Sequence, residues 1–132
     1  MLSAKAEREE VVMYADRFEV CIARVRHRFA TSLESKIRTA MAATDHMTRD
    51  DGGAVQYVTN SYRNLHSIFG VGASVGFAAT GDAARDAEAA LIQAYEEKRG
   101  LTEDEVLSLK SALAKLQDIA GTELRSMYQR GG

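Results

Sequence analysis

Apolar residues recur at intervals of three or four positions through the first third of the chain. The series is Val11, Ala15, Phe18, Ile22, Val25, Phe29, Leu33, Ile37 and Met41. This spacing places them on one face of a helix, and the 132 residues contain no proline to interrupt it. The pattern predicts one helix from about Lys5 to Ala43, or two helices that meet near Thr31 and Glu34, which have capping-box spacing. The unbroken stripe favours the single helix.

Three more helical patterns follow a polar, glycine-containing loop at residues 44–53. The second pattern begins near Ala54 and ends near Gly76. The third covers roughly residues 79–98, and we expect Gly100 to cap its C-terminal end. The last begins at the sequence TEDE, which has the spacing of a capping box and places acidic side chains in the first helical turn.

Four helical patterns joined by short loops predict an all-α fold, an up-down four-helix bundle with an elongated N-terminal helix. Residues 1–132 are expected to form a single domain. The first helix exceeds the ordinary length of a helix in a globular protein. Its N-terminal part is therefore expected to pack on a partner chain, and a homodimer through this helix is one candidate.

Composition excludes several classes of protein. Apolar residues make up 45% of the chain, and the net charge of -2 comes from mixed charges of both signs, which argues against a nucleic-acid binder with a concentrated basic face. No apolar run reaches the length of about eighteen residues that a membrane span needs. The start, MLSAKAEREE, becomes charged too early for a secretory signal, so we expect a cytoplasmic protein. The single cysteine, Cys21, lies in the apolar pattern and is expected to be a buried thiol.

We expect neither a metal site nor a cofactor. His46 lies near Asp45, Asp50 and Asp51, but this loop lacks an ordered ligand spacing such as that of an EF-hand. The chain also lacks a P-loop, a dinucleotide fingerprint and the glycine motifs of a kinase ATP site. The chain therefore contains no nucleotide-binding motif of its own.

One histidine, His66, precedes a series of glycines in the sequence YRNLHSIFGVGASVGF. A glycine inside a helix costs about 1 kcal/mol relative to alanine. Gly70 lies one turn after His66 on the same face, where a missing side chain leaves the imidazole accessible to another protein. Two alternatives stay open from the spacing alone: His66 is a solvated bystander, or the glycines, Gly72 among them, serve close helix packing.

The segment HSIFGVGASVGF resembles the phosphorylation motif of histidine phosphotransfer (HPt) domains, most closely that of chemotaxis histidine kinases. The matching residues are His66, Ser67, Ile68, Gly70, Ala73, Gly76 and Phe77. The resemblance covers roughly residues 33–119. It implies a helical bundle with an exposed histidine midway along one helix.

The resemblance also implies a function. His66 would accept a phosphoryl group and pass it to, or take it from, the aspartate of a response-regulator receiver domain in two-component signalling. The chain would be a phosphocarrier rather than an enzyme, and its partners would be a receiver domain and a histidine kinase, hybrid kinases included. Glu88 corresponds to a family glutamate that hydrogen-bonds the histidine, which implies that it holds Nδ1 while Nε2 attacks phosphorus.

One position departs from the family. Phe69 stands three residues after the histidine, where the family normally has a lysine that favours phosphate at the site. Arg85, one turn before Glu88, and Arg63, one turn before the histidine, are the candidates for supplying positive charge instead. The residues expected to face a receiver are Ser67, Phe69, Gly70 and Ala73. The departure also motivates an alternative, a degenerate HPt-like adaptor that binds a receiver or kinase, or dimerises, without phosphotransfer.

Overall fold

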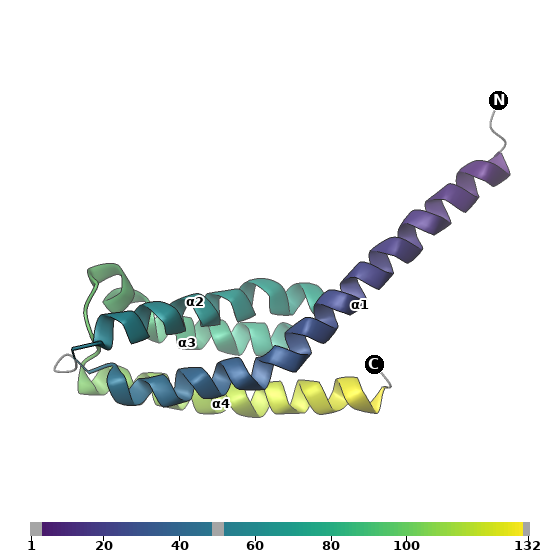
Figure 1. Ribbon diagram of the computed structural model, residues 1–132. Helices are drawn as coiled ribbons and strands as arrows, with labels where there is room; N and C mark the ends of the chain where they lie inside the picture. Colours follow the sequence, from purple (N-terminus) through teal and green to yellow (C-terminus); the bar gives the residue numbers. More distant parts are fainter. Residues whose placement is uncertain (1–3, 49–51, 131–132) are drawn as a thin grey trace.

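The computed structural model describes residues 4–48 and 52–130, and it is an all-α bundle (Figure 1). Its helices are α1 (Ala4–Ala43), α2 (Ala54–Gly72), α3 (Ala78–Glu97) and α4 (Glu103–Gln129), with 3-10 turns at Thr44–His46 and Ala73–Val75. These ranges contain no β-strand, and none of their helices has an apolar stretch long enough to cross a bilayer. The predicted all-α four-helix bundle with a long first helix is confirmed. Residues 49–51 of the expected loop, Asp50 and Asp51 among them, lie outside the described residues.

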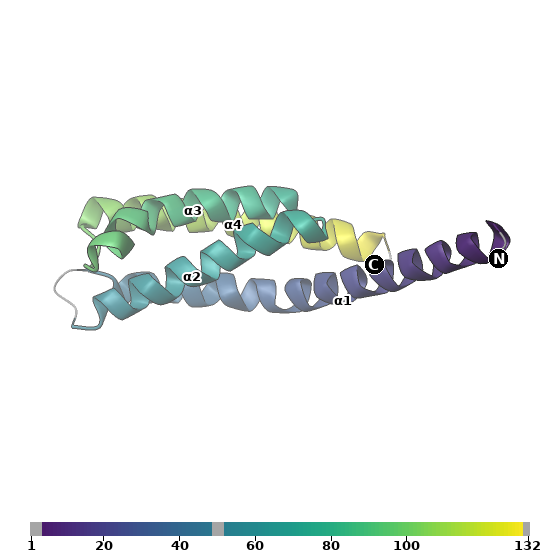
Figure 2. The same ribbon diagram turned by 90° about the horizontal axis from the view of Figure 1, so that it is seen from above.

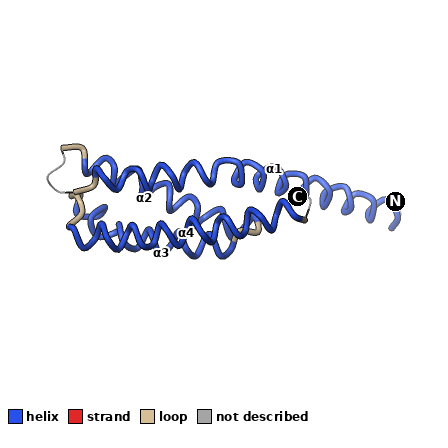
Figure 3. Tube along the Cα trace, turned by 90° about the horizontal axis from the view of Figure 1, so that it is seen from below, coloured by secondary structure: helices blue, strands red, loops and turns tan. Residues whose placement is uncertain are grey.

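The helices run up and down as antiparallel neighbours. Helix α3 packs along both α2 and α4, and α1 lies against α4 and α2 (Figure 2 and Figure 3). The core consists mainly of alanine and branched aliphatic side chains, together with Phe29, Phe77, Met47 and Met127, and buried alanines line α3. The largest fully buried side chains are those of Phe77, Leu33, Ile37, Met47, Leu65, Ile68, Leu91, Leu101, Leu109, Leu113, Leu116 and Val58. Each such side chain contributes roughly 1.5–3 kcal/mol of burial free energy.

Helix α1 is continuous, as the unbroken stripe predicts, but only its C-terminal part belongs to the bundle. From Phe29 onward its stripe is buried. Residues 4–25, which we call the arm, extend beyond the other helices (Figure 1), and Val11 and Phe18 of the same stripe are each 67% exposed. The expectation that Cys21 is a buried thiol is wrong, because its side chain lies on the arm and is exposed. Packing of this part on a partner chain stays a prediction.

Two helix ends have the caps that the sequence predicts, and a third does not. Gly76 ends the second helical segment in the left-handed conformation, with φ of 91°, and Thr102 and Glu105 form the predicted capping box. The expected cap at Gly100 is wrong, because the left-handed residue after α3 is Lys98, with φ of 53°. The helix ends earlier because the backbone N–H groups of Lys98 and Arg99 turn back onto carbonyls of the last helical turn.

The first turn of α3 receives its cap from another helix. Its own N-cap residue, Phe77, offers no side-chain acceptor. Instead, the backbone N–H and the hydroxyl of buried Thr80 both donate to Oε1 of Glu123 on α4, each at 2.6 Å. A carboxylate here satisfies a free N–H group and interacts favourably with the positive end of the helix dipole. This contact fixes the start of α3 on α4.

Candidate functional site

His66 points away from the bundle because its neighbours on α2 point into it. Leu65 and Ile68 are each 1% exposed, so the helical repeat turns the residue after Leu65 outward. The side chain of His66 is 62% exposed. The open, accessible imidazole expected from the glycine pattern is therefore present.

The imidazole is held by a carboxylate from the next helix. Nδ1 of His66 lies 2.9 Å from Oε1 of Glu88 on α3, and the Glu88 side chain is only 12% exposed. A carboxylate accepts a hydrogen bond, so Nδ1 carries the proton in the neutral ring and Nε2 keeps its lone pair. Within residues 4–48 and 52–130, no hydrogen bond to Nε2 of His66 is found. The nitrogen available for chemistry is thus the one that faces solvent.

An aromatic stack supports this pair from one side, and the sequence pattern did not reveal it. The ring of Tyr62 lies parallel to that of His66, with centroids 5.9 Å apart, and packs at 3.9 Å on Tyr95 of α3. Tyr62 also hydrogen-bonds Glu88; burial, this bond and the negative charge of Glu88 all raise the pKa of Tyr62 above 10.0. The hydroxyl therefore stays protonated and donates to the same carboxylate. The available signal was the spacing of four residues from Tyr62 to His66.

Gly70 and Gly72 have different roles: one leaves space beside His66, and the other allows close packing of two helices. A Cβ at Gly70 would meet nothing within 4 Å, so this position is open space beside the histidine. A Cβ at Gly72 would lie 3.0 Å from the carbonyl oxygen of Phe77 and 3.4 Å from the Cα of Gly81. Gly70 clears the surface, whereas Gly72 and Gly81 allow α2 and α3 to approach closely near the site.

The basic residues are placed unequally. Arg85 of α3 lies over the ring of Phe69, with Cζ 5.6 Å from the ring centroid, and the Phe69 ring is tilted against His66 with centroids 6.4 Å apart. Arg85 therefore lies next to Phe69, the residue that the resemblance to HPt motifs aligns with a lysine. Arg63 is exposed, and no hydrogen bond or ion pair joins it to His66 or Glu88 in the part of the chain that the structure describes.

The residues expected to face a receiver lie on the exposed side of α2 and on the turn that follows it. Ser67, Gly70 and Ala73 are exposed, and Phe69 is half-buried against the core. They border the exposed imidazole, so a partner that reaches His66 would also touch them.

Comparison with protein-family models, with curated proteins and with solved structures finds no match for this chain. The side chains of the site nevertheless define the chemistry that it can perform. It combines an exposed ring nitrogen with a lone pair, a carboxylate that fixes the tautomer, and an arginine nearby. Such a group can act as a nucleophile toward an electrophile brought by another molecule.

Proposed function

We propose that this protein is a histidine-containing phosphotransfer protein of two-component signalling. His66 accepts a phosphoryl group on Nε2 and relays it to or from the aspartate of a response-regulator receiver domain. The observation that carries the proposal is the exposed imidazole whose Nδ1 lies 2.9 Å from Glu88. The chain acts as a phosphocarrier without an ATP site, so a histidine kinase or a phosphorylated receiver, working in the cytoplasm, supplies the phosphoryl group.

The proposed reaction is an in-line displacement at phosphorus. The Nε2 lone pair attacks the phosphorus of the receiver's aspartyl phosphate, a P–N bond forms, and the P–O bond to the aspartate breaks to release its carboxylate. The ring gains positive charge as the P–N bond forms. Glu88, which accepts the hydrogen bond from Nδ1–H, stabilises that charge. The reverse reaction returns the group to a receiver by the same path.

The transferring phosphoryl group also needs cations, because negative charge spreads over its equatorial oxygens. The family's lysine is replaced by Phe69, and we assign its role to Arg85, whose guanidinium lies over the Phe69 ring. Arginine suits this task, since its planar donors bind phosphate oxygens in pairs. Arg63, exposed one turn before His66 on α2, is the second candidate.

A receiver docks on the surface around His66 in this proposal. Gly70 leaves room for the partner's backbone, since no atom lies within 4 Å of the position of a Cβ there. Ser67, Ala73 and the exposed part of Phe69 border the same surface. Such a transient interface is expected to be small, with an apolar centre near His66 and a polar rim.

The test is transfer of label from a phosphorylated receiver. Wild-type protein is expected to take up label that is stable to alkali and lost in acid, as the P–N bond of phosphohistidine requires. His66→Gln removes the nucleophile from an exposed position, so it keeps the fold and takes up none. His27→Gln, which changes another exposed histidine on α1, serves as the matched control and should label normally. Equal labelling of wild type and His66→Gln, across several receivers and kinases, would refute the proposal.

A second candidate function is a helical adaptor that binds a receiver or kinase without chemistry. The observation that favours it is Phe69, an aromatic ring in the position of the family's lysine, 6.4 Å from the His66 ring. An adaptor would bind its receiver equally well after His66→Ala. Phe69→Lys separates the two: an active carrier that already uses Arg85 changes only modestly, whereas an inactive adaptor gains labelling.

A further inference from the structure

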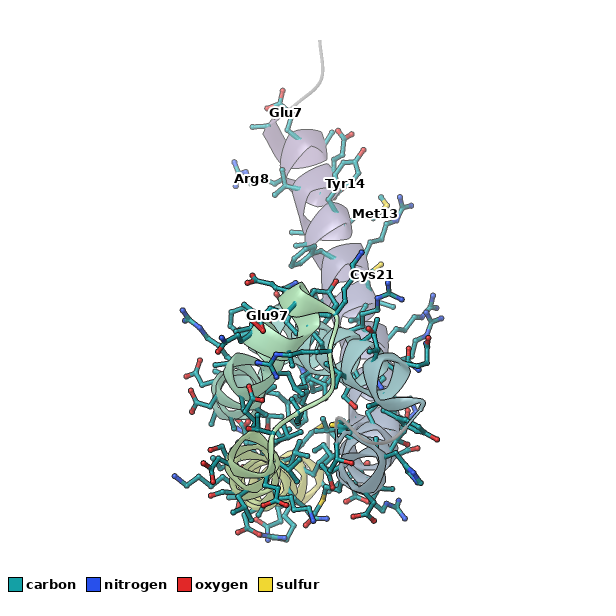
Figure 4. The ribbon with its side chains drawn as sticks, turned by 90° about the vertical axis from the view of Figure 1, so that its left-hand side faces the viewer. Glu7, Arg8, Met13, Tyr14, Cys21 and Glu97 are labelled. Atoms are coloured by element: carbon teal, nitrogen blue, oxygen red, sulfur yellow. The ribbon has the colours of Figure 1, made fainter. Side chains whose placement is uncertain are left out.

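The arm carries an apolar stripe that nothing in the described chain covers. Val11, Tyr14, Phe18, Cys21 and Val25 alternate in steps of three and four, and all are exposed. Figure 4 shows the side chains of Met13 and Tyr14 on the part of α1 that extends beyond the bundle. Alternating steps of three and four are the heptad pattern by which one helix packs on another.

The arm is long enough to be an interface of its own. At 1.5 Å per residue, residues 4–25 extend about 33 Å. A single helix of this length without tertiary contacts is only marginally stable in water. Packing of its apolar stripe on a second helix supplies the missing stabilisation.

Charge is distributed unequally along the arm. Its beginning carries Glu7, Glu9 and Glu10 beside Lys5 and Arg8, so acidic residues are in excess there, and the segment where it joins the bundle carries Arg24, Arg26 and Arg28 and no acidic residue. Two arms side by side in the same direction would place like charges together. Two arms in opposite directions place the acidic end of each beside the basic end of the other, which favours an antiparallel pair.

The position of the bundle also selects the antiparallel arrangement. The stripe continues from the arm into Phe29, which is buried against the other helices. The bundle begins at Arg26, whose Nε donates to the carbonyl of Val75 at the end of α2. The bundle therefore lies on the side of α1 that a partner arm would cover. In a parallel pair two bundles would compete for that space, whereas in an antiparallel pair they lie at opposite ends.

We propose that the arm is a self-association site and that two copies of this chain pair antiparallel through it. Val11 of each copy packs opposite Cys21 of the other. Tyr14 of each copy packs against Phe18 of the other, so these two contacts lie on either side of the two-fold axis. In this register Glu7 lies opposite Val25, the last residue of the arm, so the paired segment ends just before Arg26, where the bundle of the other copy begins. His66 of each copy lies on α2 of its own bundle and is not part of the paired arms.

The first test is the mass of the full chain in solution, measured by light scattering and sedimentation across a wide range of concentrations. Wild type is expected to rise from 14.4 kDa toward twice that mass. Phe18→Glu should weaken association about tenfold or more. Val20→Glu changes another exposed apolar residue on the opposite face of the same helix and should leave association unchanged. A wild-type mass of 14.4 kDa at every concentration, or equal effects of the two variants, overturns the proposal.

The second test concerns direction. Reversing the acidic end, with Glu7→Lys, Glu9→Lys and Glu10→Lys, should weaken association, and adding Arg24→Glu and Arg28→Glu should restore it. A parallel pair would respond little to the first change, because like charges already face each other there. If the added substitutions Arg24→Glu and Arg28→Glu do not restore the dimer, the arms do not pair antiparallel.

The third test uses the single cysteine. With a short thiol-to-thiol cross-linker, wild type should form little covalent dimer, because each Cys21 faces Val11. Val11→Cys, with Cys21 kept, should form covalent dimer in high yield. Efficient cross-linking of wild type and no gain in the variant would indicate the parallel arrangement and overturn the proposed register. Labelling of His66 by a phosphorylated receiver is independent of all three tests.

Discussion

Arg85 lies over the ring of Phe69, with its Cζ 5.6 Å from the ring centroid, at the edge of the His66 site. The two residues come from different helices, α3 and α2. The cation–π contact holds a guanidinium beside the position where a lysine side chain would otherwise be expected. The positive charge that the proposed phosphotransfer needs can thus come from a neighbouring helix instead of from α2.

Arg85→Gln is expected to slow phosphotransfer to His66 roughly tenfold, because it removes a cation from the developing charge of the phosphoryl group. Stability should change little, since Arg85 is exposed. The measurement is the rate of label uptake from a phosphorylated receiver in rapid-quench experiments. Arg38→Gln, which neutralises another exposed arginine on α1, is the control. An equal reduction by both variants would mean that only the overall charge matters.

Glu88→Gln is expected to slow phosphotransfer by about 10–100-fold, because the amide no longer stabilises positive charge on the ring or enforces one tautomer. Tyr62→Phe keeps the ring that stacks on His66 and removes only the hydroxyl that donates to Glu88, so its effect should be smaller. Nitrogen-15 NMR of the imidazole reports the tautomer directly. The assignment of Glu88 fails if the tautomer population is the same in wild type and Glu88→Gln.

Gly70→Ala and Gly72→Ala are expected to have opposite effects on stability. A Cβ at Gly70 meets nothing within 4 Å, so alanine gains up to about 1 kcal/mol of helix propensity. A Cβ at Gly72 lies 3.0 Å from the backbone oxygen of Phe77, so α2 and α3 must separate at a cost of about 1–3 kcal/mol. Urea denaturation followed by circular dichroism measures both changes.

The Gly70 variant also tests the docking surface. A methyl group beside His66 should reduce transfer from a receiver while the fold becomes more stable. Unchanged transfer would show that a partner does not need the space at Gly70.

Glu105→Gln is expected to destabilise the bundle by about 1–2 kcal/mol at neutral pH, because the carboxylate completes a capping box and accepts two bonds from Arg99. The hydrogen bonds from Arg99 lower the pKa of Glu105 from 4.5 to about 2, despite partial burial. A carboxyl whose pKa falls on folding stabilises the fold above its unfolded pKa. This stabilisation should be fully present above about pH 4.5 and disappear as the pH falls toward 2.

The measurement is the difference in unfolding free energy between wild type and Glu105→Gln at several pH values. The difference should shrink through this acid range and stay constant from pH 5 to pH 8. A difference that does not depend on pH would show that the lowered pKa contributes nothing to stability.

Much of the fold could be predicted from the sequence, because periodicity and helix caps are local. The stripe through Phe29 and Leu33 and the capping box at Thr102 needed no knowledge of distant residues. The cap after α3 was predicted at the wrong residue, since glycine adopts the left-handed conformation readily and pointed to Gly100, whereas the chain places Lys98 in that conformation. Periodicity likewise predicted one apolar stripe from Val11 to Met41 without showing that the bundle covers only its C-terminal part. Cys21, which lies within the uncovered part, was therefore wrongly expected to be buried.

The site was predictable in part. His66 and Gly70 could be identified from local spacing, because neighbours on one helix share a face. Glu88 was expected from the resemblance and not from spacing, and the 2.9 Å contact across two helices is a tertiary fact. The parallel rings of Tyr62 and Tyr95 depend on how closely α2 and α3 cross, which the spacing of residues along one helix does not show.

The bond between Thr80 and Glu123 has a consequence for how the molecule assembles. The group that caps α3 lies 43 residues later in the chain, so α3 gains it only after α4 has docked. Since α3 also carries Glu88, the contact between α4 and α3 helps to position the carboxylate partner of His66. The geometry at His66 therefore depends on a helix that contributes no residue to the site, and its reactivity is coupled to completion of the fold.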